Sequence, residues 1–154
     1  RACVHAVRSR HSGQFQPTRA DVRAGLVQGT AWPARPRRVK GMGKGMGKAD
    51  KRVPCFVQVD LGEEQQKGGC PVAELPALLD QARSADIPIA GLMCLPPADI
   101  EPAPFFAFLD KLARDHGLEG RSMGMSGDYE TAIKLGATHV RVGTARFGAR
   151  PPRD

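Results

Sequence analysis

Residues 121–144, "RSMGMSGDYETAIKLGATHVRVGT", hold two strand-like stretches with a helix-like stretch between them. "RSMGMS" and "THVRVGT" have the length and composition of short strands. "DYETAIKLG" has the composition of a helix, and Gly136 stands where a glycine commonly follows a helix C-terminus. The stretch therefore predicts one strand-helix-strand unit of a parallel sheet.

The same alternation continues toward the N-terminus as far as residue 53. "VPCFVQVD" (53–60) and "IPIAGLMCL" (87–95) predict two more strands, and residues 71–86 and 102–117 predict helices. The expected apolar stripes are Val72, Leu75, Leu78 and Leu79 in the first helix and Phe105, Phe108, Leu109 and Leu112 in the second. This order predicts a parallel sheet covered by helices, either a doubly wound sheet or a (β/α)8 barrel.

Charge divides the 154-residue chain into two parts. Residues 1–52 contain 13 basic and 2 acidic residues, a net charge of +11, whereas residues 53–154 contain 10 and 14, a net charge of −4. The first part is rich in Gly, Pro and Arg and includes the repeat "GMGKGMGK", so we expect it to be irregular. Nucleic-acid binding by this segment is a weak alternative, because only Phe15 and Trp32 are available for stacking.

Several classes of protein do not match the composition. No run of about 18 apolar residues is present, and the N-terminal stretch lacks the apolar core of a secretory signal. The four cysteines, Cys3, Cys55, Cys70 and Cys94, are far apart, which argues against a metal site or a disulfide framework. We expect reduced, mostly buried thiols in a cytoplasmic protein.

The carboxyl ends of the last two predicted strands have the residues of an anion site. Ser126 is placed to cap the following helix, while Gly127 and the Gly143-Thr144 turn offer backbone N–H groups. In (β/α)8 barrels a phosphate commonly binds between the loops after the last two strands. The alternative is that these residues are only a cap and two turns. Asp128 and Glu130 count against the anion site unless they point outward.

Arg141 stands between two valines of the last predicted strand. Neighbouring residues of a strand face opposite sides, so Arg141 points into the barrel or cleft if Val140 and Val142 pack under the helices. A buried guanidinium needs an acceptor. That acceptor is either a ligand or a carboxylate of the protein such as Asp60.

"VQVDLGEEQQKGG", "GLMCLPP" and "SMGMSGDYETAIKLGATHVRVGTARFGAR" together carry a family resemblance. From about Val53 to Arg150 the chain resembles the pyridoxal phosphate homeostasis protein family, single-domain relatives of the alanine racemase N-terminal barrel. The resemblance implies a (β/α)8 barrel that binds pyridoxal 5′-phosphate (PLP), a role in vitamin B6 and amino-acid homeostasis, and delivery of PLP to PLP-dependent apoenzymes.

The resemblance also assigns the cofactor-binding residues. Arg141 matches the arginine that faces the pyridine nitrogen. Ser126, Gly143 and Thr144 match the cradle around the phosphate, and Met125 matches a residue that lines the same end. No catalytic residue is assigned, because the family's cofactor lysine, in a sequence like "AVSK" on the first barrel strand, has no counterpart here.

Only four strand-helix units are recognisable. We therefore expect residues 53–154 to be the C-terminal half of a PLP-binding barrel, a truncated form without the Schiff-base lysine that binds PLP weakly and non-covalently. Within residues 1–52, only "GQFQPTR" (13–19) weakly resembles the family. A frame-shifted reading of the gene is one hypothesis for this segment. A diverged, genuine N-terminal extension is the other, and the parent DNA sequence distinguishes the two.

An enzymatic function remains the main alternative. A fold-type III PLP enzyme such as an amino-acid racemase requires a catalytic lysine and an opposing tyrosine. The chain has one tyrosine, Tyr129, in the helix after the phosphate turn.

Overall fold

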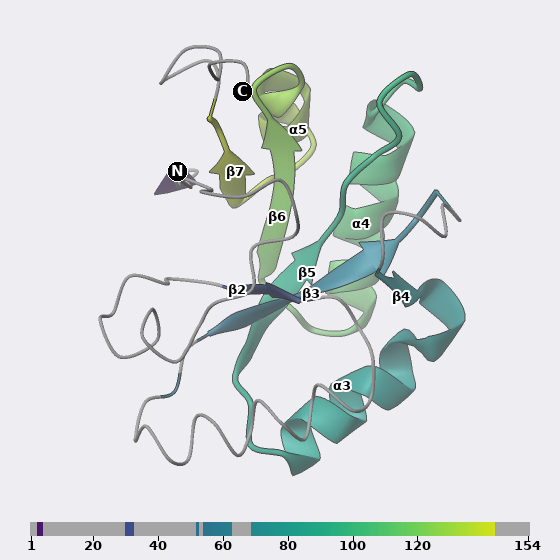
Figure 1. Ribbon diagram of the computed structural model, residues 1–154, viewed down its shortest axis with the longest axis vertical. Helices are drawn as coiled ribbons and strands as arrows, with labels where there is room; N and C mark the ends of the chain where they lie inside the picture. The colour runs from purple at the N-terminus through teal and green to yellow at the C-terminus, as the bar shows by residue number, and fades with distance from the viewer. Residues whose placement is uncertain (1–2, 5–29, 33–51, 53, 63–68, 144–154) are drawn as a thin grey trace, which may run out of the picture.

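The computed structural model describes residues 3–4, 30–32, 52, 54–62 and 69–143 (Figure 1). The strands are β1 (Cys3–Val4), β2 (Thr30–Trp32), β3 (Cys55–Asp60), β4 (Cys70–Pro71), β5 (Ile89–Met93), β6 (Gly120–Met125) and β7 (His139–Arg141). The helices are the 3-10 helix η1 (Val72–Glu74) and the α-helices α3 (Leu75–Ser84), α4 (Ala103–Asp115) and α5 (Tyr129–Lys134). The four strands and three helices expected after residue 53 are all present.

The strands form one sheet in the order β1-β7-β6-β5-β3-β2, with β4 paired to β3, and every pair is parallel. The helices α3, α4 and α5 connect successive strands of this sheet. All three contribute to a single hydrophobic core, so they cover the same face of the sheet. A doubly wound sheet would have helices on both faces. The architecture is therefore a partial (β/α)8 barrel, with the helices outside.

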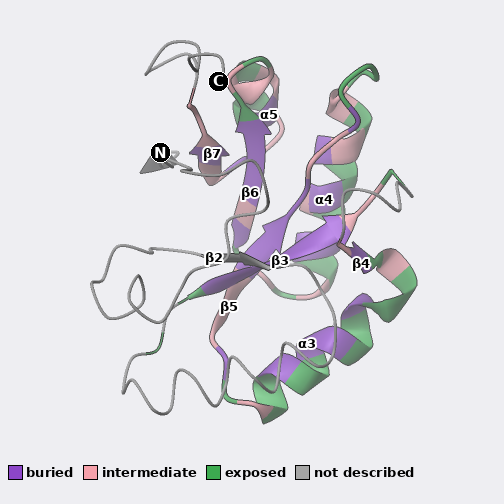
Figure 2. Ribbon diagram, in the orientation of Figure 1, coloured by how far each residue is buried: buried purple, intermediate pink, exposed green. Residues whose placement is uncertain are grey.

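The two faces of β3 show the alternation that this architecture requires. Val57 and Val59 are buried in the core under the helices. Phe56 and Gln58 alternate with them and so lie on the inner face, where they are also buried. Figure 2 shows buried residues along the central strands and along the helix faces that are turned toward them.

The apolar stripe of α4 differs from the prediction. Phe106, Leu109, Leu112 and Ala113 are its buried residues, whereas Phe108 is 42% exposed and Phe105 is half-buried. The two stripes share Leu109 and Leu112 and differ by a small rotation of the helix. The predicted stripe contains two phenylalanines and the buried one contains only Phe106, so the number of large apolar side chains favoured the wrong stripe. In α3 the prediction of Leu75, Leu78 and Leu79 is confirmed. Val72 lies before α3, in η1, and is half-buried.

Two short stretches of the basic N-terminal segment are strands that the residue pattern does not predict. Cys3 pairs with His139 of β7, and Thr30 pairs with Cys55 of β3, so β1 and β2 occupy the two ends of the sheet order. Strands of two or three residues are too short to leave a periodic signal. The rest of residues 1–51, including "GMGKGMGK", lies outside the described residues, and its predicted irregularity stays a prediction.

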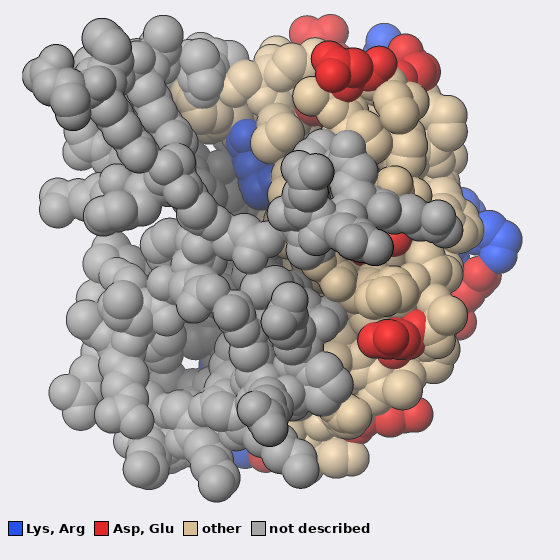
Figure 3. Space-filling model, turned by 45° about the vertical axis from the view of Figure 1, so that its right-hand side comes forward, with Lys and Arg blue, Asp and Glu red and all other residues tan. Residues whose placement is uncertain are grey.

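The described surface carries many acidic side chains on the face shown in Figure 3, in keeping with the negative charge of residues 53–154. Within the described ranges, none of the helices has the length and apolar character that a membrane crossing requires.

The inner face contains a close approach between two glycines. Gly91 of β5 lies opposite Gly120 of β6. A Cβ atom on Gly91 would lie 2.0 Å from the Gly120 carbonyl oxygen, and one on Gly120 would lie 2.6 Å from Cε1 of Phe56. The Phe56 ring contacts the His139 ring edge-on at 4.8 Å. Because glycine has no side chain, Gly120 leaves room for the Phe56 ring and so for the aromatic contact between β3 and β7.

Replacement of Gly91 by alanine is expected to lower the free energy of unfolding by about 2–3 kcal/mol, because backbone atoms of β6 must move to admit the methyl group. Gly127→Ala is the matched control, since a Cβ atom at Gly127 meets no atom within 4 Å. Its effect should stay within about 0.5 kcal/mol. Urea unfolding curves measure both, and an equal effect of the two variants would contradict the close packing of β5 on β6.

The buried thiols should make stability fall at alkaline pH. Cys55, Cys70 and Cys94 are buried, reduced thiols, as expected, and burial raises the pKa of the Cys55 thiol from 9.0 to about 12. Above pH 9 the unfolded chain loses this proton and the folded chain keeps it. The free energy of unfolding should therefore fall between pH 9 and pH 11, by up to about 1.4 kcal/mol per pH unit for this thiol.

The variant Cys55→Ala isolates this contribution, because every other ionisable side chain is the same in both proteins. Urea unfolding at several pH values from 8 to 11 should give a shallower decline for the variant. Parallel curves would show that the Cys55 thiol is accessible in the folded chain.

Candidate cofactor site

One extra residue in β6 sets the geometry at the carboxyl ends of β6 and β7. Ser122 pairs with His139, but Met125 pairs with Arg141, so three steps along β6 match two along β7. Gly124 lies within this irregular stretch with φ +92°, and a Cβ atom there would lie 2.6 Å from Cβ of Ala132 in α5. A glycine is required for both reasons. The turn after β6 consequently begins level with Arg141.

The turns that follow the two strands lie side by side. The Gly143 N–H donates a hydrogen bond to Ser126 Oγ over 3.3 Å. The two turns are therefore in direct contact through this hydrogen bond. Met125 lies at the rim and is 42% exposed. Thr144, which the resemblance also assigns to the phosphate cradle, lies outside the described residues.

Ser126 is not the N-cap of the following helix, and that prediction is wrong. The helix α5 starts at Tyr129, and Asp128 holds the N-cap position. Residues 126–128 instead form a turn, which leaves the Ser126 hydroxyl directed toward Gly143. A serine before a glycine and an acidic residue suits either arrangement, so sequence could not decide between cap and turn.

Arg141 lies on the inner face, as the alternation of β7 predicts. Val140 is buried in the core under the helices, and Val142 packs against that core. The Arg141 guanidinium donates one hydrogen bond to the Cys94 carbonyl oxygen (2.9 Å) and one to Ser122 Oγ (3.4 Å). Sequence could not reveal the first partner, because a backbone oxygen leaves no trace in the residue types.

The charge of Arg141 has no ionic partner within the described part of the chain. No carboxylate oxygen there lies within 4.0 Å of the guanidinium, so the ion pair with Asp60 does not form. Burial lowers the pKa of Arg141, while the negative charge of Asp128 acts in the opposite direction. The half-buried guanidinium thus donates only to uncharged oxygens of the described residues. This arrangement lowers the stability of the fold unless a ligand supplies a further acceptor.

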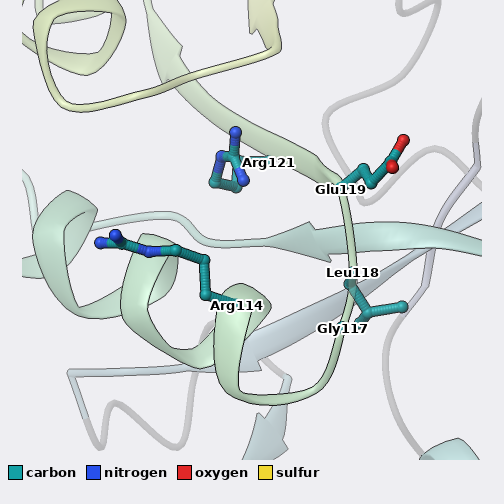
Figure 4. A pocket seen from close by; sticks show the side chains of 5 residues that line it. All are labelled: Arg114, Gly117, Leu118, Glu119 and Arg121. Atoms are coloured by element: carbon teal, nitrogen blue, oxygen red, sulfur yellow. The ribbon is translucent and has the colours of Figure 1, made fainter.

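A hollow of about 510 Å³ lies at the opposite end of β6, lined by Arg114, Gly117, Leu118, Glu119 and Arg121. Its charged groups do not converge, since Figure 4 shows Arg114 and Glu119 pointing in different directions. Arg121 Nε donates to the Gly136 carbonyl oxygen over 2.7 Å, and Asp110 pairs with both arginines. These charges serve the packing of β6 against α4, and the residues predicted from sequence lie at the other end of the strand.

Comparisons with known proteins agree with the family suggested by the sequence. The family described as the alanine racemase N-terminal domain matches residues 34–151. The chain is 44% identical over 100 residues to the pyridoxal phosphate homeostasis protein of Pseudomonas aeruginosa, covering 61% of this chain and 44% of that protein. It is 36% identical over 125 residues to the protein of the same name from Corynebacterium glutamicum, covering 73% and 55%.

Solved structures give the same result. PipY of Synechococcus elongatus, solved without PLP, superposes with a TM-score of 0.76 at 26% identity over 89% of this chain and 69% of PipY. Its PLP-bound form gives a TM-score of 0.74 at 25% identity, over 86% of this chain and 68% of PipY. The chain spans about half the length of the curated relatives it matches. The resemblance predicted from the quoted motifs is confirmed.

Replacement of Arg141 by methionine is expected to raise the free energy of unfolding of the ligand-free chain by about 1–2 kcal/mol, because it removes a half-buried charge that lacks a carboxylate partner. Arg121→Met on the neighbouring strand should lower it by about 1–2 kcal/mol, since Asp110 and the Gly136 carbonyl lose a donor. Urea unfolding compares the two. A loss of stability in both variants would make Arg141 a structural residue.

Proposed function

The chain belongs to the alanine racemase N-terminal domain family, and we propose that it binds PLP non-covalently and serves in vitamin B6 and amino-acid homeostasis. Curated relatives carry the name pyridoxal phosphate homeostasis protein, and PipY has been solved with PLP bound. In this proposal the chain stores PLP and releases it to PLP-dependent apoenzymes.

The observation that carries the proposal is the short distance between the two strand-end turns. Ser126 Oγ and the Gly143 nitrogen lie 3.3 Å apart, so a phosphate that replaces Ser126 Oγ as the acceptor of the Gly143 N–H also lies within reach of the Ser126 hydroxyl. Oxygen and nitrogen donors of this kind bind phosphate oxygens without a bulky side chain in the way. Thr144 follows directly in the sequence and adds a hydroxyl in this proposal.

Arg141 supplies the second half of the proposed site. It lies level with Met125, two residues before Gly143, and its guanidinium is on the inner face of the sheet. A guanidinium donates hydrogen bonds and does not accept them, so it recognises the pyridine nitrogen in its unprotonated form. When bound, PLP supplies an electron-withdrawing ring, and an unprotonated ring withdraws electrons less strongly. This favours storage of PLP over carbanion chemistry.

The described lysines also favour a carrier over an enzyme. Lys111 and Lys134 are exposed on α4 and α5, outside the sheet, and the other lysines (40, 44, 48, 51 and 67) lie outside the described residues. The Tyr129 hydroxyl lies 3.4 Å from a carboxylate oxygen of Glu130, so its local partner is on the same helix. Neither observation supplies the lysine and opposing tyrosine that a racemase needs.

The proposal predicts that the two halves of the site can be separated by choice of ligand. Pyridoxine 5′-phosphate and pyridoxine lack the aldehyde, so they avoid reaction with lysines and differ only in the phosphate. Ser126→Ala should weaken pyridoxine 5′-phosphate roughly tenfold through a lost hydrogen bond to an anion and leave pyridoxine within about twofold. Arg141→Met should weaken both. Isothermal titration calorimetry measures the affinities of both ligands for the unaltered chain and for each variant.

Glu130→Gln is the control, because it removes an exposed charge near the turn and should change neither affinity more than about twofold. Failure of the unaltered chain to bind pyridoxine 5′-phosphate at millimolar concentration would refute the proposed function. Borohydride treatment after PLP addition tests the non-covalent mode, and a high-occupancy adduct on one lysine would contradict it.

A further inference from the structure

Asp128 makes a reciprocal pair of hydrogen bonds across the turn that carries Ser126. The Met125 N–H donates to Asp128 Oδ1 over 2.5 Å, and the Asp128 N–H donates to the Met125 carbonyl oxygen over 3.1 Å. The two bonds close a ring around residues 125–128. A turn held at both ends has fewer conformations available than one held by a single bond.

Ser126 and Gly127 lie between the two ends of this ring. Ser126 lies at the tip and accepts the Gly143 N–H. Gly127 follows it, is exposed, and its N–H has no hydrogen-bond partner within the described residues. Asp128 itself is half-buried. The acidic side chain thus faces back into the turn, and the tip presents a hydroxyl and an N–H.

A carboxylate here is hard to explain as a direct contact to an anionic ligand. Its charge opposes a phosphate dianion, and α5, which it precedes, has only six residues. Its hydrogen bond to the Met125 N–H over 2.5 Å gives it a different role, which is to hold a backbone donor at the end of β6. Gly124 directly precedes this turn, and its φ of +92° sets the direction in which the chain enters it.

We infer that Asp128 is a positioning residue for phosphate binding: it fixes the turn 125–128 so that Ser126 and Gly127 meet a phosphate group, and it does not touch the ligand. This inference rests on the proposed function for its ligand, whereas the turn geometry stands without it. The acceptor atom matters for this task, and the negative charge does not.

Three variants separate the acceptor from the charge. Asp128→Asn keeps an oxygen that accepts the Met125 N–H and removes the charge, Asp128→Ala removes both, and Glu130→Gln removes a nearby charge without altering the turn. Pyridoxine 5′-phosphate and pyridoxine are titrated against each full-length variant by calorimetry. Circular dichroism spectra confirm that each variant is folded.

Asp128→Ala should weaken pyridoxine 5′-phosphate by about tenfold or more and leave pyridoxine within about twofold. Asp128→Asn should bind pyridoxine 5′-phosphate within about threefold of the unaltered chain or more tightly, because repulsion of the phosphate is removed. Equal losses in the alanine and asparagine variants would overturn the inference, as would unchanged binding in the alanine variant or equal losses for both ligands.

Hydrogen exchange tests the same inference without a ligand. The Met125 amide should exchange at least about tenfold faster in Asp128→Ala than in the unaltered chain, with protection retained in Asp128→Asn and Glu130→Gln. Unchanged protection in Asp128→Ala would overturn the inference. Absence of pyridoxine 5′-phosphate binding by the unaltered chain, with the exchange pattern as expected, would instead remove the proposed function and confine Asp128 to holding the turn.

Discussion

The parallel pairing of β6 with β7, with one extra residue in β6, is the constraint from which the candidate site follows. Without the irregularity between Ser122 and Met125, the turn after β6 would lie out of step with Arg141. Gly124 makes it possible, because its positive φ and its contact with α5 exclude a side chain. This β-bulge in β6 thus determines the relative positions of the Ser126 hydroxyl and the Arg141 guanidinium.

The fold was largely predictable because its signals are local. Val57 and Val59 lie on one face and Phe56 and Gln58 on the other, and helices of ten or more residues such as α3 repeat their apolar residues often enough to be recognised. The choice between a barrel and a doubly wound sheet was not local. It depends on all helices covering one face, which no single segment of the sequence encodes.

The site was predictable in its residue types but not in its bonds. Glycine, serine and arginine at strand ends indicated an anion and a buried cation, and the turn residues do lie together. The partners of Arg141 could not be foreseen, since one is the Cys94 carbonyl and the other is on a neighbouring strand. Asp128 was counted against an anion site because a residue type reports a charge, whereas the hydrogen bond to Met125 reports where that charge is directed.

These contacts fit the proposed storage and release of PLP better than they fit very tight binding. Within the described residues, the turns that would meet a phosphate offer a hydroxyl and backbone N–H groups, while Asp128 adds a nearby negative charge. Arg141, the cation that the structure describes at these strand ends, donates to the Cys94 carbonyl and to Ser122 and in this proposal meets the ring rather than the anion. Neutral donors bind a phosphate with modest strength compared with a bidentate arginine. A protein that must release its cofactor to another is better served by such contacts than by a salt bridge, because each ion pair would slow dissociation.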